Sequence, residues 1–179
     1  MEKNVVVLVG PSGSGKTTIA NELAKRGFPK ATTCTTRNKR EGEMEGVSYF
    51  FLSQGEFLHR VSTGDIVEFS IYANNFYGTS ASTLKDYIST NKKVVLVMDI
   101  NGAETVKKMF PENVVTIFLD RDERDLIKAI LERNVSNDEK TDRIMQLKHD
   151  FEAAEKCDFV VQNKDIIDTV AEILHIMYT

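Results

Sequence analysis

The chain has 179 residues, of which 41% are hydrophobic and 28% charged, a balance typical of a compact globular protein and not of a disordered or fibrous one. Its 23 basic and 27 acidic residues give a formal net charge of −4, so we expect no nucleic-acid partner. The two cysteines are too few for a disulfide framework, and each apolar run is far shorter than the roughly 20 residues that span a membrane. We expect a cytoplasmic protein without membrane association, either a monomer or a dimer.

Short aliphatic runs and amphipathic stretches follow one another through most of the chain. The runs that predict strands are 5–9, 94–98, 114–119 and 159–161. The stretches with helical periodicity are 17–26, 103–110, 122–133, 139–156 and 166–178. Short strands without polar alternation, joined by helices, are typical of a parallel sheet covered on both faces. We therefore predict an α/β fold with a doubly wound parallel sheet.

Residues 33–90 show a different pattern. Partly polar segments predict short strands at 49–52, 66–69 and 75–78. Ser53 and Glu56 have the S-x-x-E spacing of a capping box, which predicts a helix over 54–62. We predict that the segment forms a small mixed or antiparallel lobe inserted into a core. That core would comprise residues 1–32 and 91–179.

A second polar interruption lies at 134–140, between two stretches with helical periodicity. Ser136 and Glu139 give it another possible capping box. Polar connections between helices are usually plain surface, but mobile lids over active sites are also built from them. We predict a helical lid at about 133–143.

The clearest motif, GPSGSGKT at residues 10–17, has the form G-x-x-x-x-G-K-[ST] of a phosphate-binding loop and lies between a predicted strand and a predicted helix. Its glycines allow backbone N–H groups to approach phosphate oxygens, and a helix N-terminus favours an anion. We expect a purine nucleoside triphosphate here, with Lys16 at its β- and γ-phosphates and the Thr17 hydroxyl on Mg²⁺. The residues predicted to bind it are Gly10, Pro11, Ser12, Gly13, Ser14, Gly15, Lys16, Thr17 and Thr18.

A basic segment, TTRNKREGE, follows at 35–43. It contains Arg37 and Arg40, and Tyr49 lies shortly after it. Two guanidinium groups and a phenol that converged on one point would bind a dianionic phosphate. Taken alone, the same residues also fit a solvated basic loop. Glu43 is near enough in sequence to orient the arginines or to steer metal-bound water.

The run T-T-R-x-x-R-x-G-E-x-x-G-x-x-Y-F over 35–50 resembles the nucleoside-monophosphate segment of the guanylate kinase family, and further matches follow at 66–69 and 75–79. The resemblance extends from about residue 5 to about residue 163, with the motifs in the family's order. It implies a P-loop nucleoside monophosphate kinase that transfers the γ-phosphoryl group of ATP reversibly to GMP or dGMP with Mg²⁺. The GMP-binding residues that it implies are Thr33, Arg37, Arg40, Tyr49, Glu68, Tyr77, Gly78, Thr79 and Asp99.

The resemblance places Glu68 opposite the guanine base, and the chemistry suits this role. Guanine presents its N1–H and 2-amino donors side by side, and a carboxylate accepts from both. Adenine has neither donor, so its binding would leave the carboxylate unpaired. Thr33 and Thr79 carry hydroxyls that would donate to guanine O6 or position the base.

The same resemblance assigns charge neutralisation during transfer to Lys16, Arg40, Arg133 and Arg143. We also expect Asn163, which follows the predicted strand at 159–161, near the ATP base. The chain departs from the family pattern at two positions. Val97 stands where the first of two aspartates is usual, which leaves Asp99 as the carboxylate for Mg²⁺-bound water or acceptor contacts. Ala129 stands where the family has an arginine on the helix before the lid.

Two alternative functions stay open. The first is a P-loop kinase of another phosphorylated acceptor, either a different nucleotide or a sugar phosphate, and the departures at Val97 and Ala129 keep it open. The second is a non-catalytic guanylate-kinase-like module that binds phosphopeptides. Modules of that kind lack a working phosphate loop, so the intact Lys16 and Thr17 count against it.

Overall fold

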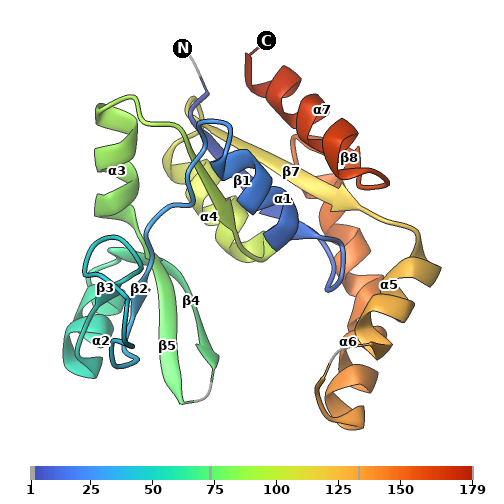
Figure 1. Cartoon of the computed structure of the whole chain (residues 1–179). Helices are drawn as coiled ribbons and strands as arrows, with labels where there is room; N and C mark the ends of the chain where they lie inside the picture. Colours follow the sequence, from blue (N-terminus) through green and yellow to red (C-terminus); the bar gives the residue numbers. More distant parts are fainter. Residues whose placement is uncertain (1–2, 73, 133, 179) are drawn as a thin grey trace. The chain divides into compact units, whose positions relative to one another are not determined.

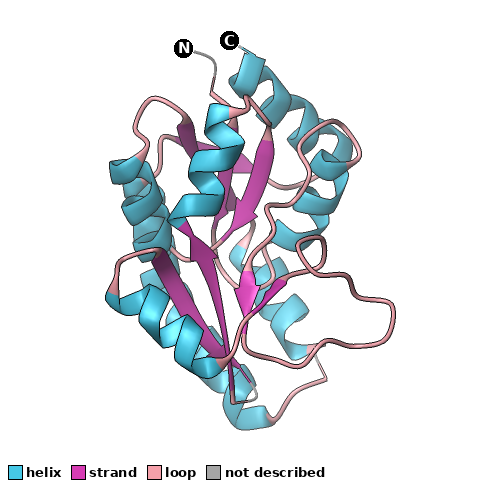
Figure 2. Ribbon diagram, turned by 90° about the vertical axis from the view of Figure 1, so that its left-hand side faces the viewer, coloured by secondary structure: helices cyan, strands magenta, loops and turns pink. Residues whose placement is uncertain are grey.

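The computed structural model describes residues 3–72, 74–132 and 134–178, and the chain divides into two compact units (Figures 1 and 2). The first unit comprises Met1–Pro29 and Lys93–Thr179, and the second comprises Lys30–Lys92. The second unit therefore interrupts the first along the chain, and its bounds lie slightly outside the predicted 33–90.

A four-stranded parallel sheet forms the centre of the first unit, in the order β6–β1–β7–β8. Its strands are β1 (Val5–Val9), β6 (Val94–Val97), β7 (Val114–Asp120) and β8 (Phe159–Gln162). Every residue of β1 is buried, because this strand lies between β6 and β7 and has helices over both faces. The four predicted strands of the core are thus confirmed. Burial on two sides explains the aliphatic runs of β1 and β7, whereas the edge strand β8 is largely exposed.

Helices cover both faces of this sheet. The helices of the first unit are α1 (Lys16–Ala24), α4 (Ile100–Met109), α5 (Glu123–Leu131), α6 (Asn137–Glu152) and α7 (Ile166–Tyr178), with a 3₁₀ turn η1 (Ala153–Lys156) after α6. Helices α1 and α7 share a buried cluster with Ile117 of β7, whereas the neighbouring Phe118 contacts Phe151 of α6. Because successive side chains of a strand point to opposite faces, these helices lie on opposite sides of the sheet. The predicted doubly wound α/β fold is confirmed.

Helices α5 and α6 pack against each other through the buried side chains of Leu126, Ile130 and Leu147. Ser136 caps α6 by accepting a hydrogen bond from the Glu139 N–H at 3.2 Å. The Glu139 carboxylate pairs with Arg143 on the next turn of α6. Within the described ranges, no helix combines the length and the apolar character needed to cross a membrane.

The second unit is built on a mixed sheet in the order β3–β2–β5–β4. Its elements are β2 (Cys34–Thr35), β3 (Phe50–Phe51), α2 (Gln54–Ser62), β4 (Ile66–Tyr72), β5 (Asn75–Ser80) and α3 (Ala81–Ser89). Strands β2 and β3 run parallel, whereas β5 is antiparallel to both β2 and β4. The capping box of α2 is confirmed, because Ser53 and Glu56 each accept a hydrogen bond from the other's backbone N–H.

Two elements of the second unit have no counterpart among the predicted ones. Strand β2 has only two residues, so it shows no periodicity. Helix α3 begins at the residue after β5, with Ser80 as both the last strand residue and the helix cap, so no loop separates them in the sequence. The buried centre of this unit is formed by Cys34, Phe57 and Ile66.

Candidate functional site

The phosphate-loop motif forms the turn between β1 and α1. Gly10, Gly13 and Gly15 have φ angles of 143°, 93° and 91°, in the region that side-chain-bearing residues rarely adopt. A Cβ at Gly10 would also lie 2.7 Å from the backbone oxygen of Leu119 in β7. The backbone conformation therefore favours glycine at all three positions, and at Gly10 the close approach of β7 requires it as well.

Two side chains hold successive carbonyl groups of this loop. Arg121 donates from Nη1 to the Gly13 oxygen at 3.1 Å, and Asn163 donates from Nδ2 to the Ser14 oxygen at 2.6 Å. Asn163 in turn accepts at Oδ1 a hydrogen bond of 3.1 Å from the buried Thr169 hydroxyl of α7. Since the C=O and N–H of a trans peptide point in opposite directions, the contact at Ser14 directs the N–H of Gly15 away from Asn163.

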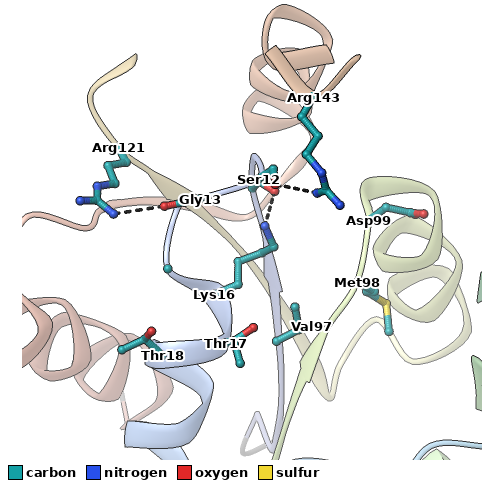
Figure 3. A pocket seen from close by; sticks show the side chains of 12 residues that line it. Ser12, Gly13, Lys16, Thr17, Thr18, Val97, Met98, Asp99, Arg121 and Arg143 are labelled. Atoms are coloured by element: carbon teal, nitrogen blue, oxygen red, sulfur yellow. Dashed lines mark hydrogen bonds between the residues drawn. The ribbon is translucent and has the colours of Figure 1, made fainter. Parts of the chain in front are cut away.

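A cavity of about 570 Å³ lies over the loop, a volume typical of small-molecule sites (Figure 3). Its lining residues are Gly10, Ser12, Gly13, Gly15, Lys16, Thr17, Thr18, Val97, Met98, Asp99, Arg121 and Arg143. Of the other predicted loop residues, Pro11 contributes a carbonyl group to the Lys16 ammonium, and Ser14 is fully buried. The structure thus brings the predicted loop residues together with Asp99 and Arg143.

Two of the predicted catalytic cations lie at this cavity. The Lys16 ammonium donates to the carbonyl oxygens of Gly10 and Pro11, both at 2.7 Å. Arg143 of α6 donates from Nη1 to the Ser12 hydroxyl at 2.9 Å, and Glu139 holds the other side of its guanidinium at 2.7 Å (Figure 3). The prediction for Arg133 falls outside the described residues.

The carboxylate end of the cavity is formed by Asp99, the N-cap of α4. Its Oδ1 accepts a hydrogen bond of 2.9 Å from the Gly102 N–H. Val97 lies two residues earlier, lines the same cavity and is 41% exposed, so the departure at this position places an apolar side chain there. The Thr17 hydroxyl and the Asp99 carboxylate are hard oxygen donors of the kind that Mg²⁺ prefers. Among the described residues, no group of three or more His, Cys, Asp or Glu side chains is placed to hold a metal.

The second unit has a cavity of its own, of about 420 Å³. Its lining residues are Arg37, Arg40, Glu43, Tyr49, Ser70 and Tyr77. Four of these, the two arginines and the two tyrosines, are among the residues that the resemblance implies for GMP binding. The structure brings them together and adds Ser70, which carries no sequence signal of its own.

Arg37 is held firmly within this cavity. Its Nη2 donates to Glu43 at 2.6 Å, and the side chains of the two residues are only 13% and 21% exposed. Its guanidinium also lies 5.6 Å from the ring centre of Tyr49. The hydrogen bond to Glu43 raises the pKa of Arg37, and the hydrogen bonds from Arg37 and the Arg40 backbone lower the pKa of Glu43. Both groups are therefore charged at neutral pH.

Strands β4 and β5 place further predicted residues on the same face of their hairpin. Ser70 pairs with Tyr77, and Glu68 pairs with Thr79. Residues two apart share a face of a strand, so the Glu68–Thr79 pair lies roughly 7 Å along the strands from the Ser70–Tyr77 pair. Thr79 is buried, with 3% of its surface exposed, and its hydroxyl donates to Glu68 Oε1 at 2.7 Å.

Two other predicted GMP-binding residues are placed by backbone contacts. A Cβ at Gly78 would lie 2.7 Å from the Glu68 backbone oxygen and 2.9 Å from the Phe57 ring, so glycine is required for strand packing. The Thr33 carbonyl accepts a hydrogen bond from the Phe50 N–H at 2.9 Å. Neither residue lines the cavity of the second unit.

Sequence reasoning missed Arg121 and Ser70, and only tertiary contacts reveal them. Arg121 follows the end of β7 and comes to the phosphate loop because β7 pairs with β1. Ser70 is an ordinary strand residue whose partner across the sheet is Tyr77. Asn163, expected near the ATP base, contacts the loop backbone.

Comparison with known proteins identifies one family over the whole chain. The family model for guanylate kinase matches residues 2–179. A guanylate kinase of Salinibacter ruber is 35% identical over 97% of this chain and 94% of its own length. One of Prochlorococcus marinus subsp. pastoris is 32% identical over 98% of this chain and 97% of its own length.

Solved structures agree with this match. The crystal structure of guanylate kinase from Anaplasma phagocytophilum superposes with a TM-score of 0.71 at 30% identity, covering 99% of this chain and 85% of that one. The shikimate kinase of Aquifex aeolicus reaches a TM-score of 0.50 at 20% identity, over 97% of this chain and 96% of that one. This second likeness shows the fold alone.

Proposed function

This chain belongs to the guanylate kinase family, and on that premise we propose that it transfers the γ-phosphoryl group of ATP to GMP, giving ADP and GDP. The observation that carries the proposal is the pairing of two phosphate-binding constellations in one chain. One is a glycine loop with Lys16 and Arg143 at its cavity, and the other is a cavity with two arginines and two tyrosines. A kinase with a phosphorylated acceptor needs both.

On the donor side, the backbone N–H groups of the loop and the N-terminus of α1 hold the triphosphate. Lys16 exchanges the carbonyl oxygens of Gly10 and Pro11 for phosphate oxygens, and Arg143 adds a second positive charge. Phosphoryl transfer proceeds through a largely dissociative transition state with the attacking and leaving oxygens in line. These cations therefore act by positioning the group and stabilising the charge that spreads over it.

On the acceptor side, Arg37 and Arg40 bind the phosphate of GMP, and the Tyr49 and Tyr77 hydroxyls donate to its remaining oxygens. Glu43 fixes the Arg37 guanidinium and also accepts from the Arg40 backbone N–H at 2.8 Å, so the Arg37 side chain and the Arg40 backbone are positioned before the substrate arrives. A preorganised side chain such as Arg37 reduces the entropy lost on binding.

Guanine selection is assigned to Glu68. Its carboxylate accepts from the N1–H and 2-amino groups of guanine, while the Thr79 hydroxyl fixes its orientation through Oε1. Adenine offers no hydrogen at N1 and no 2-amino group, so the desolvated carboxylate would receive no hydrogen bond from the base. Thr79 thus acts through Glu68 rather than on the base.

For Mg²⁺, the Thr17 hydroxyl is the proposed ligand, with Asp99 placed to accept from water bound to the ion. When bound, Mg²⁺ neutralises part of the triphosphate charge. A site that relies on one protein hydroxyl and phosphate oxygens suits this ion, because Mg²⁺ keeps several waters and is rarely bound by an all-protein cage.

For location, the proposal is a reducing cytoplasm. The cysteines, Cys34 and Cys157, are free thiols. Burial raises the pKa of each to about 11, so both are protonated at neutral pH and are poor nucleophiles. Cys34 packs in the centre of the second unit, as a small apolar side chain would.

The test is ADP release from Mg·ATP with GMP, dGMP, AMP, CMP, UMP or ribose 5-phosphate as acceptor. Turnover with GMP and dGMP alone is the expected result. Turnover with another acceptor would keep the kinase and replace the substrate. Binding of Mg·ATP without turnover on any acceptor would contradict the proposed reaction, and absence of Mg·ATP binding would favour a non-catalytic module.

A further inference from the structure

Arg121 lies at the donor cavity, and none of the roles assigned above uses it. It follows the last residue of β7 and lines the cavity together with Lys16 and Arg143. Its Nη1 donates to the Gly13 carbonyl oxygen at 3.1 Å, and its Nε lies 3.9 Å from an Asp125 carboxylate oxygen. In Figure 3, Arg121 and Arg143 approach the phosphate loop from opposite sides.

Ala129 touches the same point of the loop. A Cβ at Gly13 would lie 3.2 Å from the Ala129 Cβ, so this face of α5 packs directly against the turn. Residue 129 is where the family resemblance leads us to expect an arginine. The chain therefore has no charge at this position of α5, but it has one at Arg121, which contacts the same glycine.

The guanidinium of Arg121 can bind more than the loop. An arginine presents five N–H donors in a planar fork, and the bond to Gly13 uses one of them. Its side chain is 35% exposed, and the residue lines the cavity. The distance of 3.9 Å to Asp125, whose side chain is 59% exposed, makes that ion pair weak and easily exchanged for phosphate.

We propose that Arg121 binds the polyphosphate chain of the donor nucleotide and supplies, from the end of β7, the positive charge that residue 129 lacks. The inference rests on the proposed function only in taking a nucleoside triphosphate as the ligand of the phosphate loop. It adds a third cation to Lys16 and Arg143 on the donor side, and it makes Arg121 a substrate-binding residue as well as a brace for Gly13.

The test compares wild type with Arg121→Gln in the full chain. Isothermal titration calorimetry gives the dissociation constants of Mg·ATP and of Mg·tripolyphosphate, which has no base. We expect the dissociation constants of both ligands to be at least roughly 10-fold higher for the variant, the usual cost of losing a charge-assisted contact. The KM for GMP stays unchanged. Arg124→Gln is the matched control, because this exposed arginine is three residues further along the chain and does not line the cavity.

The salt dependence of binding distinguishes phosphate binding by Arg121 from a role limited to bracing Gly13. Exposed charge pairs are screened as ionic strength rises. For each ligand, the dissociation constant of Arg121→Gln divided by that of wild type should therefore shrink toward one at high salt. A ratio that does not change with salt would overturn the proposal. Adding Ala129→Arg to Arg121→Gln returns a charge to the same side of the loop, and we expect it to recover part of the lost affinity.

Three other results would also overturn the inference. They are unchanged affinity in Arg121→Gln, weaker binding of Mg·ATP with unchanged binding of Mg·tripolyphosphate, and equal losses in Arg124→Gln. The second result would place the guanidinium on the base. Failure of the proposed function appears separately, as wild-type protein that binds Mg·ATP but does not phosphorylate GMP. A melting temperature for each variant confirms that it is folded.

Discussion

The phosphate loop of the first unit presents its backbone to the ligand, whereas the cavity of the second unit presents side chains. The loop occupies eight consecutive residues, and its glycines, Gly10, Gly13 and Gly15, adopt conformations that few other residues tolerate. The second cavity is lined from several separate segments, and its central feature is the ion pair between Arg37 and Glu43. A backbone site is specified locally, and a side-chain site is specified by the sheet that assembles it.

The two sites should also fail differently. In the loop, a single lysine and the bracing of two carbonyl groups serve whichever triphosphate binds. In the second unit, we assign orientation to Glu43, which fixes Arg37, and selectivity to Glu68, which we propose faces the base. Variants of the loop should therefore affect every substrate pair, and variants of the second unit should affect one acceptor.

The largest effect is expected for Lys16→Ala. The Lys16 ammonium donates to two loop carbonyl groups, which phosphate oxygens of Mg·ATP would replace. Loss of the ammonium therefore removes charge stabilisation in the transition state. We expect kcat to fall by roughly 10³-fold with all acceptors, as for loss of a donor at developing charge. Steady-state kinetics measures this, with the exposed Lys128→Ala as control. A fall confined to GMP would contradict the division between the two sites.

Glu68→Gln should give the next largest effect, and only on the acceptor side. The amide presents a donor where guanine also has one, so a buried hydrogen bond is lost and a clash of donors replaces it. We expect kcat/KM for GMP to fall by about 100-fold with the KM for ATP unchanged. Glu41→Gln removes a charge from an exposed residue of the same unit and serves as control. Equal losses for the two variants would show that charge, not base reading, is measured.

Asn163→Ala tests the bracing of the loop backbone. The change leaves the Ser14 carbonyl and the Thr169 hydroxyl without their side-chain partner. We expect the KM for ATP to rise roughly 10-fold, the cost of one unsatisfied buried group, with the KM for GMP unchanged. Gln162→Ala is the matched control, since this neighbouring residue is exposed. A larger effect on GMP than on ATP would contradict the assignment.

The smallest effect concerns pH and the Arg37–Glu43 pair. The pKa of Glu43 is lowered from 4.5 in the folded chain by the hydrogen bonds from Arg37 and the Arg40 backbone. A lowered folded-state pKa contributes stability above the unfolded value, and that contribution is lost as the pH falls through the folded value. Urea unfolding should therefore show Glu43→Gln destabilised at neutral pH, with the difference from wild type shrinking below pH 4.5. A difference that does not depend on pH would show that the pair adds no such stability.

The fold was predictable from the sequence where burial was continuous. The run at 5–9 is aliphatic because β1 is covered on both faces, and the motif that follows fixes the turn into α1. Strand β2 and helix α3 were not predicted, for two different reasons. The strand is too short for periodicity, and the helix begins without any intervening loop.

The site residues were predictable where a local motif or the family resemblance identified them. Lys16 and the glycines followed from the motif, and the resemblance supplied Arg37, Arg40, Tyr49 and Tyr77, which the structure gathers at one cavity. Arg121 could not be predicted, because its proximity to Gly13 arises from the pairing of β7 with β1 across 108 residues of chain. The role of Thr79 was hidden for a similar reason, since its register with Glu68 depends on how β4 and β5 pair.

The two carbonyl contacts of the Lys16 ammonium bear on how products leave. A bare ammonium released from the diphosphate product would have to recover its hydration shell. In this loop the oxygens of Gly10 and Pro11 take its donors at 2.7 Å, so the departing diphosphate is exchanged for partners already in place. Because these partners stabilise the ligand-free state of the ammonium, they weaken its net hold on phosphate and lower the barrier to dissociation. Turnover limited by product release would gain from this directly.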